Sequence, residues 1–349
     1  MAQSNVLIGV MSGTSLDGLD ICACTFASDN TFEIIKAETI AYDVTTIALL
    51  KEAETCGGVR LTEIDRVYGR LIGEHVARFI DQHLKDKAVT AVASHGHTIF
   101  HAPKNGYTLQ IGHGSAIAAA CGLPVICDFR SLDVALGGQG APLVPIGDQL
   151  LFGNYDACLN IGGFANISFE ENGIRVAGDI CPANYILNAL ASRVDLSYDA
   201  RGAIAQTGVV IPSLLAQLNN LDYYKLTFPK SLAREWVEQE IQHLLPKTLP
   251  TADLLRTCTE HAAFQIAQSL DGRKSAIVTG GGAFNTFLMQ RICEQTTCQV
   301  EIPNDQIVAF KEALIFAYLG WLRINNRVNT LKSVTGARKD SIGGAIYLA

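Results

Sequence analysis

The sequence predicts a two-lobed α/β fold in which the second half of the chain repeats the plan of the first. The chain has 349 residues, a length that favours two domains over one. Each half begins with an apolar strand, a glycine-bearing turn and a returning strand, after which strands alternate with helices. We therefore assign residues 1–141 to an N-terminal lobe, to which the segment 335–349 returns, and residues 142–334 to a C-terminal lobe.

The elements of the first half are predicted from apolar runs and from one long row of apolar residues at helical spacing. In the helix expected at 62–85, Ile64, Val67 and Leu71 fall on one face at helical spacing. The other elements expected in this half are strands at 6–11, 19–26, 33–42, 89–94 and 124–127 and helices at 45–54 and 115–121. A segment rich in glycine and proline, residues 135–145, follows, and we place the crossing between the lobes there.

The second half opens on the same pattern of strand, glycine turn and strand. Its expected strands are 157–161, 167–170, 174–176 and 275–278. Its expected helices are 184–192, 232–244, 252–270, 285–296 and 311–322, before a glycine-bearing tail at 333–348. Because the two halves share no strong sequence identity, the duplication is inferred from this pattern alone.

Composition excludes several functional classes. The chain is 48% hydrophobic and 17% charged with a net charge of −7, which indicates a globular protein without a general attraction to nucleic acid or anionic lipid. The N-terminus lacks the pattern of a signal peptide, and the apolar runs are too short to span a bilayer. The ten cysteines form no CxxC pair, so we expect reduced thiols and a cytoplasmic location.

Three glycine-bearing turns are candidate phosphate sites, because backbone N–H groups in such turns can surround an anion. They span residues 13–18, 162–166 and 280–285. In the first turn, Thr14 and Ser15 add hydroxyl donors, and Asp17 could hold a magnesium ion through water. Ordinary tight turns are the alternative interpretation of each segment, and the sequence contains no Walker-type motif.

Charged residues at predicted strand and helix ends supply candidates for chemistry. Asp179 follows a strand and precedes Pro182, so it could act as a general base or simply cap a turn or helix. Arg130 could bind a substrate carboxylate or pair locally with Asp128. Glu312 begins an otherwise apolar helix and could equally face solvent.

The pair His95 and His97 raises a different hypothesis. HxH at a strand end is the opening ligand pair of metal-dependent hydrolases, with His101, His113 or His261 as further ligands. No third ligand stands at a recognisable spacing, so a polar loop lining a cleft is the favoured interpretation.

Taken in order, these motifs resemble those of the anhydro-N-acetylmuramic acid kinase family. The matching segments are 9–20, 94–96 with Thr98, 128–130, 137–145, 160–163 with Asn166, 280–282 with Asn285, 311–313 and 335–337. The resemblance covers nearly the whole chain. It implies an actin/hexokinase-like (ribonuclease H-like) fold of duplicated domains with a central ATP cleft. It further implies that ATP, Mg²⁺ and water convert 1,6-anhydro-N-acetylmuramic acid into N-acetylmuramic acid 6-phosphate and ADP, in the recycling of cell-wall sugar.

The resemblance also assigns roles to residues. Asp179 matches the catalytic base, and Thr98, Arg130 and Glu312 match positions expected to bind the sugar. The positions expected around ATP are Gly13, Thr14, Ser15, Leu16, Asp17, Gly18, Leu19, Asp20, Gly162, Asn166, Gly280, Gly281, Gly282 and Asn285. Asp17 remains the candidate for magnesium, although the sequence departs from many proteins of this architecture, which have an aspartate where Met11 stands.

One departure leaves the substrate open. After Asp179 the family commonly has Thr-Gly-Pro-Gly-Asn, whereas residues 180–184 read Ile-Cys-Pro-Ala-Asn, so two glycines that could hold positive φ are replaced. A levoglucosan kinase and a catalytically silent sugar sensor are therefore kept as alternatives. The expected partner is a small anhydrosugar, and we expect binding to neither nucleic acid nor a membrane. A homodimer is the assembly considered.

Overall fold

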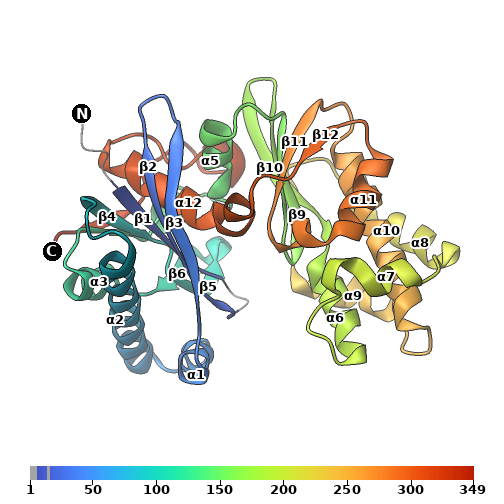
Figure 1. The fold of residues 1–349 in the computed structure, drawn as a ribbon, viewed down its shortest axis with the longest axis horizontal. Coiled ribbons are helices and arrows are strands. Elements are labelled where there is room, and N and C mark those ends of the chain that lie inside the picture. Colours follow the sequence, from blue (N-terminus) through green and yellow to red (C-terminus); the bar gives the residue numbers. More distant parts are fainter. Residues whose placement is uncertain (1–5, 14–15) are drawn as a thin grey trace. The chain divides into compact units, whose positions relative to one another are not determined.

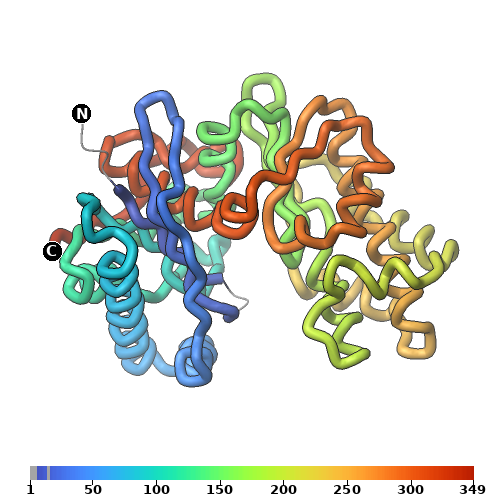
Figure 2. Tube along the Cα trace, in the orientation of Figure 1, coloured from blue at the N-terminus to red at the C-terminus, as the bar shows by residue number. Residues whose placement is uncertain are grey.

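The computed structural model describes residues 6–13 and 16–349, which form two compact units (Figures 1 and 2). Unit 1 runs to Leu151 and resumes at Phe310, and unit 2 comprises Phe152–Ala309. Among the helices of the described residues, none combines the length and hydrophobicity needed to cross a bilayer.

Unit 1 is built on a six-stranded sheet with the order β13-β7-β4-β1-β2-β3. Its strands are β1 (Val6–Ser12), β2 (Gly18–Phe26), β3 (Phe32–Ala41), β4 (Val89–Ser94), β7 (Val125–Cys127) and β13 (Ala345–Tyr347). Strand β1 is antiparallel to β2 and parallel to β4. A separate hairpin, β5 (His97–Ala102) with β6 (Tyr107–Ile111), was not predicted. The polar loop expected at 94–98 therefore shrinks to His95 and Gly96.

The helices of unit 1 cover this sheet. They are α1 (Val44–Ala53), α2 (Gly58–His83), α3 (Gly114–Cys121), α4 (Ser131–Ala135), α5 (Val144–Leu151), α12 (Asp305–Ile324) and α13 (Lys332–Thr335). Helix α2 is amphipathic, and its buried face, which includes Ile64, Tyr68 and Ile72, joins the core formed with β1 and β2. The predicted helix at 62–85 is thus confirmed, with its start four residues earlier.

Unit 2 repeats the sheet plan of unit 1. Its five strands are β8 (Ala157–Ile161), β9 (Phe164–Glu171), β10 (Ile174–Pro182), β11 (Ser275–Thr279) and β12 (Gln299–Glu301), in the order β10-β9-β8-β11-β12. Strands β8, β9 and β10 form an antiparallel meander, and β11 runs parallel to β8. The order matches β3-β2-β1-β4-β7 of unit 1, which confirms the predicted duplicated α/β architecture.

The helices of unit 2 are α6 (Asn184–Ala191), α7 (Ala203–Thr207), α8 (Pro212–Asn219), α9 (Arg234–Glu240), α10 (Thr251–Ser269) and α11 (Thr286–Gln295). The long helix predicted at 232–244 was wrong. Helix α9 ends at Glu240, and a 3₁₀ turn, Gln242–Leu244, follows it. Ile241 is the C-cap residue of α9, with a φ of −114°, and its side chain is completely buried in a core cluster.

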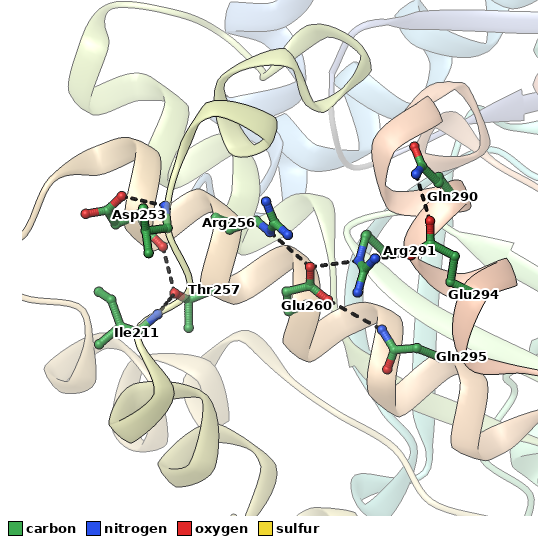
Figure 3. Close-up of polar contacts among 10 residues, drawn as sticks. Ile211, Asp253, Arg256, Thr257, Glu260, Gln290, Arg291, Glu294 and Gln295 are labelled. Carbon is green, nitrogen blue, oxygen red and sulfur yellow. Dashed lines mark hydrogen bonds and ion pairs between the residues drawn. The ribbon is translucent and has the colours of Figure 1, made fainter.

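A buried polar cluster joins α10 to α11 (Figure 3). Glu260 on α10 is almost fully buried and accepts a hydrogen bond from Arg256 Nε at 2.9 Å. The Nε atom of Arg291 on α11 lies 2.8 Å from the same carboxylate oxygen. Two guanidinium groups therefore balance one buried carboxylate, which fixes α11 against α10.

Close packing of α12 against the sheet of unit 1 depends on glycine. A Cβ atom at Gly9 on β1 would lie 1.8 Å from the carbonyl oxygen of Ala313, and one at Gly320 would lie 2.6 Å from Cβ of Ala93 on β4. Any larger side chain would force the helix away from the strands. The absence of a side chain thus lets α12 lie directly on β1 and β4.

The units divide at 151/152 and, within α12, at 309/310, whereas the sequence placed the boundaries at 141/142 and 334/335, and an ion pair joins α5 to α12 inside unit 1. Lys311 Nζ on α12 lies 3.1 Å from Asp148 Oδ1 on α5, and both side chains are almost completely buried. Helices α5 and α12 also contribute Ile146 and Ile315 to one apolar cluster. Both helices therefore pack within unit 1 rather than in the C-terminal lobe.

We expect Lys311→Met to lower the free energy of unfolding by about 3–5 kcal/mol, because it leaves the Asp148 carboxylate buried without its ammonium partner. Urea denaturation monitored by circular dichroism would measure this. The control is the double variant Lys311→Met/Asp148→Leu, which should recover most of the loss. A single variant as stable as the wild type would contradict the buried pair.

Candidate active site

Two of the predicted phosphate turns adjoin in unit 2. Gly280 has a φ of 84°, and a Cβ atom there would lie 2.6 Å from Asn160 Oδ1. A Cβ atom at Gly282 would lie 2.2 Å from Cγ2 of Ile161. The segment Gly280–Gly282 therefore lies against the end of β8, where the turn at Gly162 and Gly163 begins. Both the side chains and the backbone of the β8 end contact these glycines, because the Ile161 carbonyl oxygen would also lie 2.8 Å from a Cβ atom at Gly280.

The turn at Gly162 and Gly163 is held by the start of α6. The N–H of Ala183 donates to the Gly163 carbonyl at 2.8 Å, and the N–H of Asn184 donates to the Gly162 carbonyl at 3.2 Å. Ala183 has a φ of −120°, and Cys181 lies within β10 with its side chain fully buried in the core. Neither residue is at positive φ, but the ψ of −99° at Ala183 lies outside the usual helix and strand regions, so the alanine replaces glycine at an uncommon backbone conformation.

The strand register aligns three polar residues on one face of the unit 2 sheet. Asp179 on β10 pairs with Asn166 on β9, and Asn166 pairs with Asn160 on β8. Directly opposed residues of antiparallel strands point to the same face. The predicted base and the predicted nucleotide-binding Asn166 therefore share a row that ends beside the Gly280–Gly282 turn.

Asp179 is half-buried, and one of its carboxylate oxygens is held by the backbone. The Leu232 N–H donates to Oδ2 at 2.8 Å. Burial raises the pKa of Asp179, and the bond from Leu232 opposes that rise. Asp179 does not cap α6, whose N-cap residue is Ala183. The helix-cap alternative is therefore wrong, and a carboxylate with a raised pKa fits a proton acceptor.

The Asn285 side chain stabilises the start of a helix. Its Oδ1 accepts a hydrogen bond from the Leu288 N–H at 3.0 Å and caps α11. Its side chain also approaches Gly202, where a Cβ atom would lie 2.5 Å from Oδ1. Any contact of Asn285 with a nucleotide would have to use its amide NH₂ group or its backbone.

The first predicted phosphate turn lies in unit 1, and Thr14 and Ser15 fall outside the described residues. Before them, Gly13 follows Ser12, the last residue of β1. After them, Leu16 has a φ of 59°, and Asp17 is exposed. Gly18 begins β2, and the Leu19 side chain is completely buried. Leu19 can therefore meet a nucleotide only through its backbone.

Asp20 on β2 lies opposite Met11 on β1 and Thr39 on β3. The Thr39 hydroxyl donates to Asp20 Oδ1 at 2.6 Å. Burial, together with the negative charges of Asp17 and Glu312, raises the pKa of Asp20 to about 6. The carboxylates of Asp17 and Glu312 thus both act on Asp20, and this negative charge favours a bound cation.

Arg130 contacts His95 rather than Asp128. Its Nε and Nη2 atoms lie 3.1 Å and 2.9 Å from His95 Nε2, and Nη1 donates to the Gly140 carbonyl at 2.7 Å. Asp128 Oδ1 instead accepts a bond from the Ser131 N–H at 3.3 Å. Burial lowers the pKa of Arg130 to about 10, while the negative charge of Glu312 opposes that shift. Arg130 and Glu312, both predicted to bind sugar, therefore interact.

Glu312 reaches solvent, yet protein surrounds its carboxylate closely enough for desolvation to raise its pKa. Arg130 and Lys311 act in the opposite direction. Thr98, the third predicted sugar-binding residue, is half-buried on β5 and accepts a bond from Gln110 Nε2 at 3.3 Å. The three residues lie in unit 1, whereas Asp179 lies in unit 2.

The geometry opposes a zinc site at His95 and His97. His95 Nδ1–H donates to the Gly96 carbonyl at 2.8 Å, so Nε2 accepts from the cationic Arg130 and has no lone pair for a metal. His97 Nδ1 accepts from the Ser12 hydroxyl at 2.9 Å. In the part of the chain that the structure describes, no three metal-binding side chains cluster.

The sequence did not predict a hydrogen-bonded row of polar side chains that ends at His97. Tyr68 donates to Tyr42 at 2.6 Å, and Tyr42 donates to Ser12 at 2.7 Å, which continues to His97. Burial lowers the pKa of His97 to about 4, so this chain is neutral. Tyrosines within apolar patterns carry no local signal of such a network, because its members are distant in sequence.

A model of the anhydro-N-acetylmuramic acid kinase family matches residues 5–349. The chain belongs to this family. It is 35% identical to the anhydro-N-acetylmuramic acid kinase of Sulfurovum sp. (strain NBC37-1), with 98% of each chain covered. It is 34% identical to the enzyme of that name from Actinobacillus pleuropneumoniae serotype 3 (strain JL03), with 98% of this chain and 99% of that protein covered.

Family membership makes the chain an enzyme, a kinase that uses ATP. Among solved structures, it is similar to Plasmodium falciparum glycerol kinase with ADP, at 9% identity and a TM-score of 0.46, with 91% of this chain and 90% of that chain covered. The resemblance predicted from the motifs is thereby confirmed at the level of the family.

We expect Asp20→Asn to stabilise the protein at neutral pH. The pKa of Asp20 rises from 3.8 to about 6 on folding, so the wild type loses stability as pH rises between these values, whereas asparagine does not titrate. The variant should be more stable by about 1–2 kcal/mol above pH 6, after allowance for solvent screening. Urea midpoints from pH 4 to 8 would measure this difference.

Asp29→Asn is the control of opposite sign. The hydrogen bonds from Thr31 lower the pKa of Asp29. The ionised Asp29 carboxylate therefore stabilises the folded protein at neutral pH, and this contribution is lost as pH falls. The Asn variant should be less stable than the wild type at neutral pH and similar to it in acid. Two variants with the same pH trend would contradict the assigned environment of Asp20.

Proposed function

We propose that this enzyme hydrolytically opens the 1,6-anhydro bridge of anhydro-N-acetylmuramic acid and phosphorylates O6 with ATP. The products are N-acetylmuramic acid 6-phosphate and ADP. The observation that carries the proposal is the Asp179 carboxylate, which has a raised pKa, one oxygen bonded to Leu232, and a place in the row that leads to the glycine turns.

An anhydro sugar has no free 6-hydroxyl group, so phosphorylation must accompany opening of the bridge. Asp179 accepts a proton from a water molecule whose oxygen attacks C1. The bond between C1 and O6 breaks, its electron pair stays on O6, and O6 attacks the γ-phosphorus of ATP. The bond to the β,γ-bridging oxygen breaks and ADP leaves, so every atom of water and of the phosphoryl group is accounted for.

The glycine turns supply the nucleotide site in this proposal. In unit 2, the turns at Gly162 and at Gly280–Gly282 present backbone close to one another, which suits phosphate or the flat face of a nucleoside. In unit 1, the segment from Gly13 to Asp20 is the other predicted nucleotide-binding segment, and its Thr14 and Ser15 lie outside the described residues. Main-chain contact explains why side chains such as Leu19 can be buried there.

Arg130 is suited to the lactyl carboxylate of the sugar. A guanidinium group has five N–H donors, and contacts among the described residues use three of those of Arg130. The remaining donors on Nη1 and Nη2 can form a forked pair with a carboxylate. We assign sugar hydroxyl groups to Glu312 and Thr98, and the muramic sugar is therefore preferred to levoglucosan.

Asp17 and Asp20 are the residues that fit a hydrated magnesium ion. Magnesium keeps several waters and needs only one or two carboxylates beside the phosphates. The mutual repulsion that raises the pKa of Asp20 would be relieved by a cation. When bound, the ion would neutralise charge on the transferred phosphoryl group.

The proposed setting is recycling of cell-wall sugar in the cytoplasm, with a small anhydrosugar as the partner. The requirement for ATP supports this location, and so do the ten cysteines, which are not joined in disulfides. Nothing in the mechanism requires a second copy of the chain.

We expect Asp179→Asn to lower kcat by about 10²–10⁴-fold, because the amide cannot accept the proton of the attacking water. The assay supplies anhydro-N-acetylmuramic acid, ATP and magnesium in ¹⁸O-labelled water and follows the 6-phosphate by mass spectrometry. Wild-type product should carry label on the anomeric hydroxyl. Wild-type kcat should fall as pH drops through the raised pKa of Asp179.

Unlabelled product held in labelled water controls for exchange of the anomeric oxygen, and levoglucosan is run as the competing substrate. A 6-phosphate without label would exclude hydrolytic opening. Turnover of levoglucosan alone would exclude the muramic substrate, and a fully active Asp179→Asn enzyme would exclude this base.

A further inference from the structure

We propose that Tyr223 is a positioning residue for Asp179, acting through the main chain of the base. This inference rests on the proposed function, because it concerns the same carboxylate. The Tyr223 hydroxyl donates a hydrogen bond to the Asp179 carbonyl oxygen at 2.6 Å, although the two residues lie 44 positions apart in the sequence.

Asp179 needs such support because β10 is an edge strand. On its inner side β10 pairs only with β9, and the register shifts between Asp179 and Cys181. The outer backbone groups of an edge strand have no strand partner. At Asp179 the segment 223–232 satisfies both outer backbone groups. The Asp179 N–H donates to the Lys230 carbonyl at 2.9 Å, and the Asp179 carbonyl accepts from the Tyr223 hydroxyl.

The same segment also holds the carboxylate. Leu232, two residues after Lys230, donates its N–H to Asp179 Oδ2 at 2.8 Å. A Cβ atom at Gly178 would lie 2.6 Å from the Lys230 carbonyl oxygen, so the segment approaches β10 as closely as glycine allows. Among the described residues no hydrogen bond involves Oδ1. The carboxylate is thus fixed through Oδ2 and presents Oδ1.

Tyr223 is itself rigid enough to transmit this constraint. It is 7% exposed, and its ring lies 5.2 Å from that of Trp236. Lys230 Nζ lies 4.6 Å above the Tyr223 ring, which favours a cation–π contact. Burial, followed by the charges of Asp179 and Cys181, raises the pKa of Tyr223, so the hydroxyl stays protonated wherever the enzyme works.

Tyr224 offers a matched comparison. It lies in the same 3₁₀ turn, Asp222–Lys225, and its ring lies 6.1 Å from Trp236. Its buried hydroxyl donates to His261 Nε2 at 2.8 Å instead of to Asp179. Tyr224→Phe therefore removes an equivalent hydroxyl from the same turn and leaves the base untouched.

We expect Tyr223→Phe to lower kcat about tenfold while KM for ATP and for the sugar changes less than twofold. Loss of the hydrogen bond from Tyr223 to the Asp179 carbonyl frees the backbone of β10 at Asp179 and weakens the hydrogen bond from the Leu232 N–H to Oδ2. Because the Leu232 hydrogen bond opposes the rise in the pKa of Asp179, weakening it raises this pKa further. The acid limb of the kcat–pH profile should therefore move to higher pH. Tyr224→Phe should keep the wild-type kcat and acid limb.

A ¹³C-carboxyl NMR titration separates this inference from the proposed function. The Asp179 resonance, assigned with Asp179→Asn, should titrate at higher pH in Tyr223→Phe than in the wild type and be unchanged in Tyr224→Phe. This comparison needs no turnover, so it holds even if the anhydrosugar is not a substrate. Equal Asp179 titration in wild type and Tyr223→Phe, or equal effects of the two variants, would overturn the positioning role.

Discussion

The packing of α12 against β1 is the constraint on which unit 1 depends. Because Gly9 has no side chain, the helix backbone at Ala313 comes into contact with the strand. That contact places Lys311 within reach of Asp148 and puts Glu312 close enough to influence both Arg130 and Asp20. One missing side chain therefore brings together the buried ion pair and the charged groups assigned to the sugar.

Unit 2 uses the same strand order but a different means of holding its polar groups. Its glycine turns are fixed by backbone, with the start of α6 bonded to the carbonyls at Gly162 and Gly163. Its acidic residue stands on an edge strand and is fixed by the segment that contains Lys230 and Leu232. Duplication thus supplied the framework, whereas the contacts around each functional group are particular to each unit.

The sequence was sufficient for features written in local patterns. Apolar runs predicted most strands, helical spacing predicted α2, and glycine clusters predicted the turns at Gly162 and Gly280. The alignment of Asp179 with Asn166 and Asn160 depends on strand register, which no local pattern specifies. The local pair with Asp128, one of two alternatives for Arg130, was wrong, because Arg130 contacts His95, 35 positions away. The contacts of Tyr223 and Leu232 escaped prediction for the same reason, and the hairpin β5–β6 was missed because residues 94–98 were interpreted as a polar loop.

The segment over β10 also bears on how safely the chain folds. An uncovered edge strand can add to a strand of another molecule, which is the first step of many aggregation reactions. At Asp179 the outward N–H and carbonyl groups are already occupied by Lys230 and Tyr223. A second chain therefore finds no hydrogen-bonding partner at this point of the edge. The contacts that hold Asp179 thus also protect this point of the sheet edge against the addition of another strand.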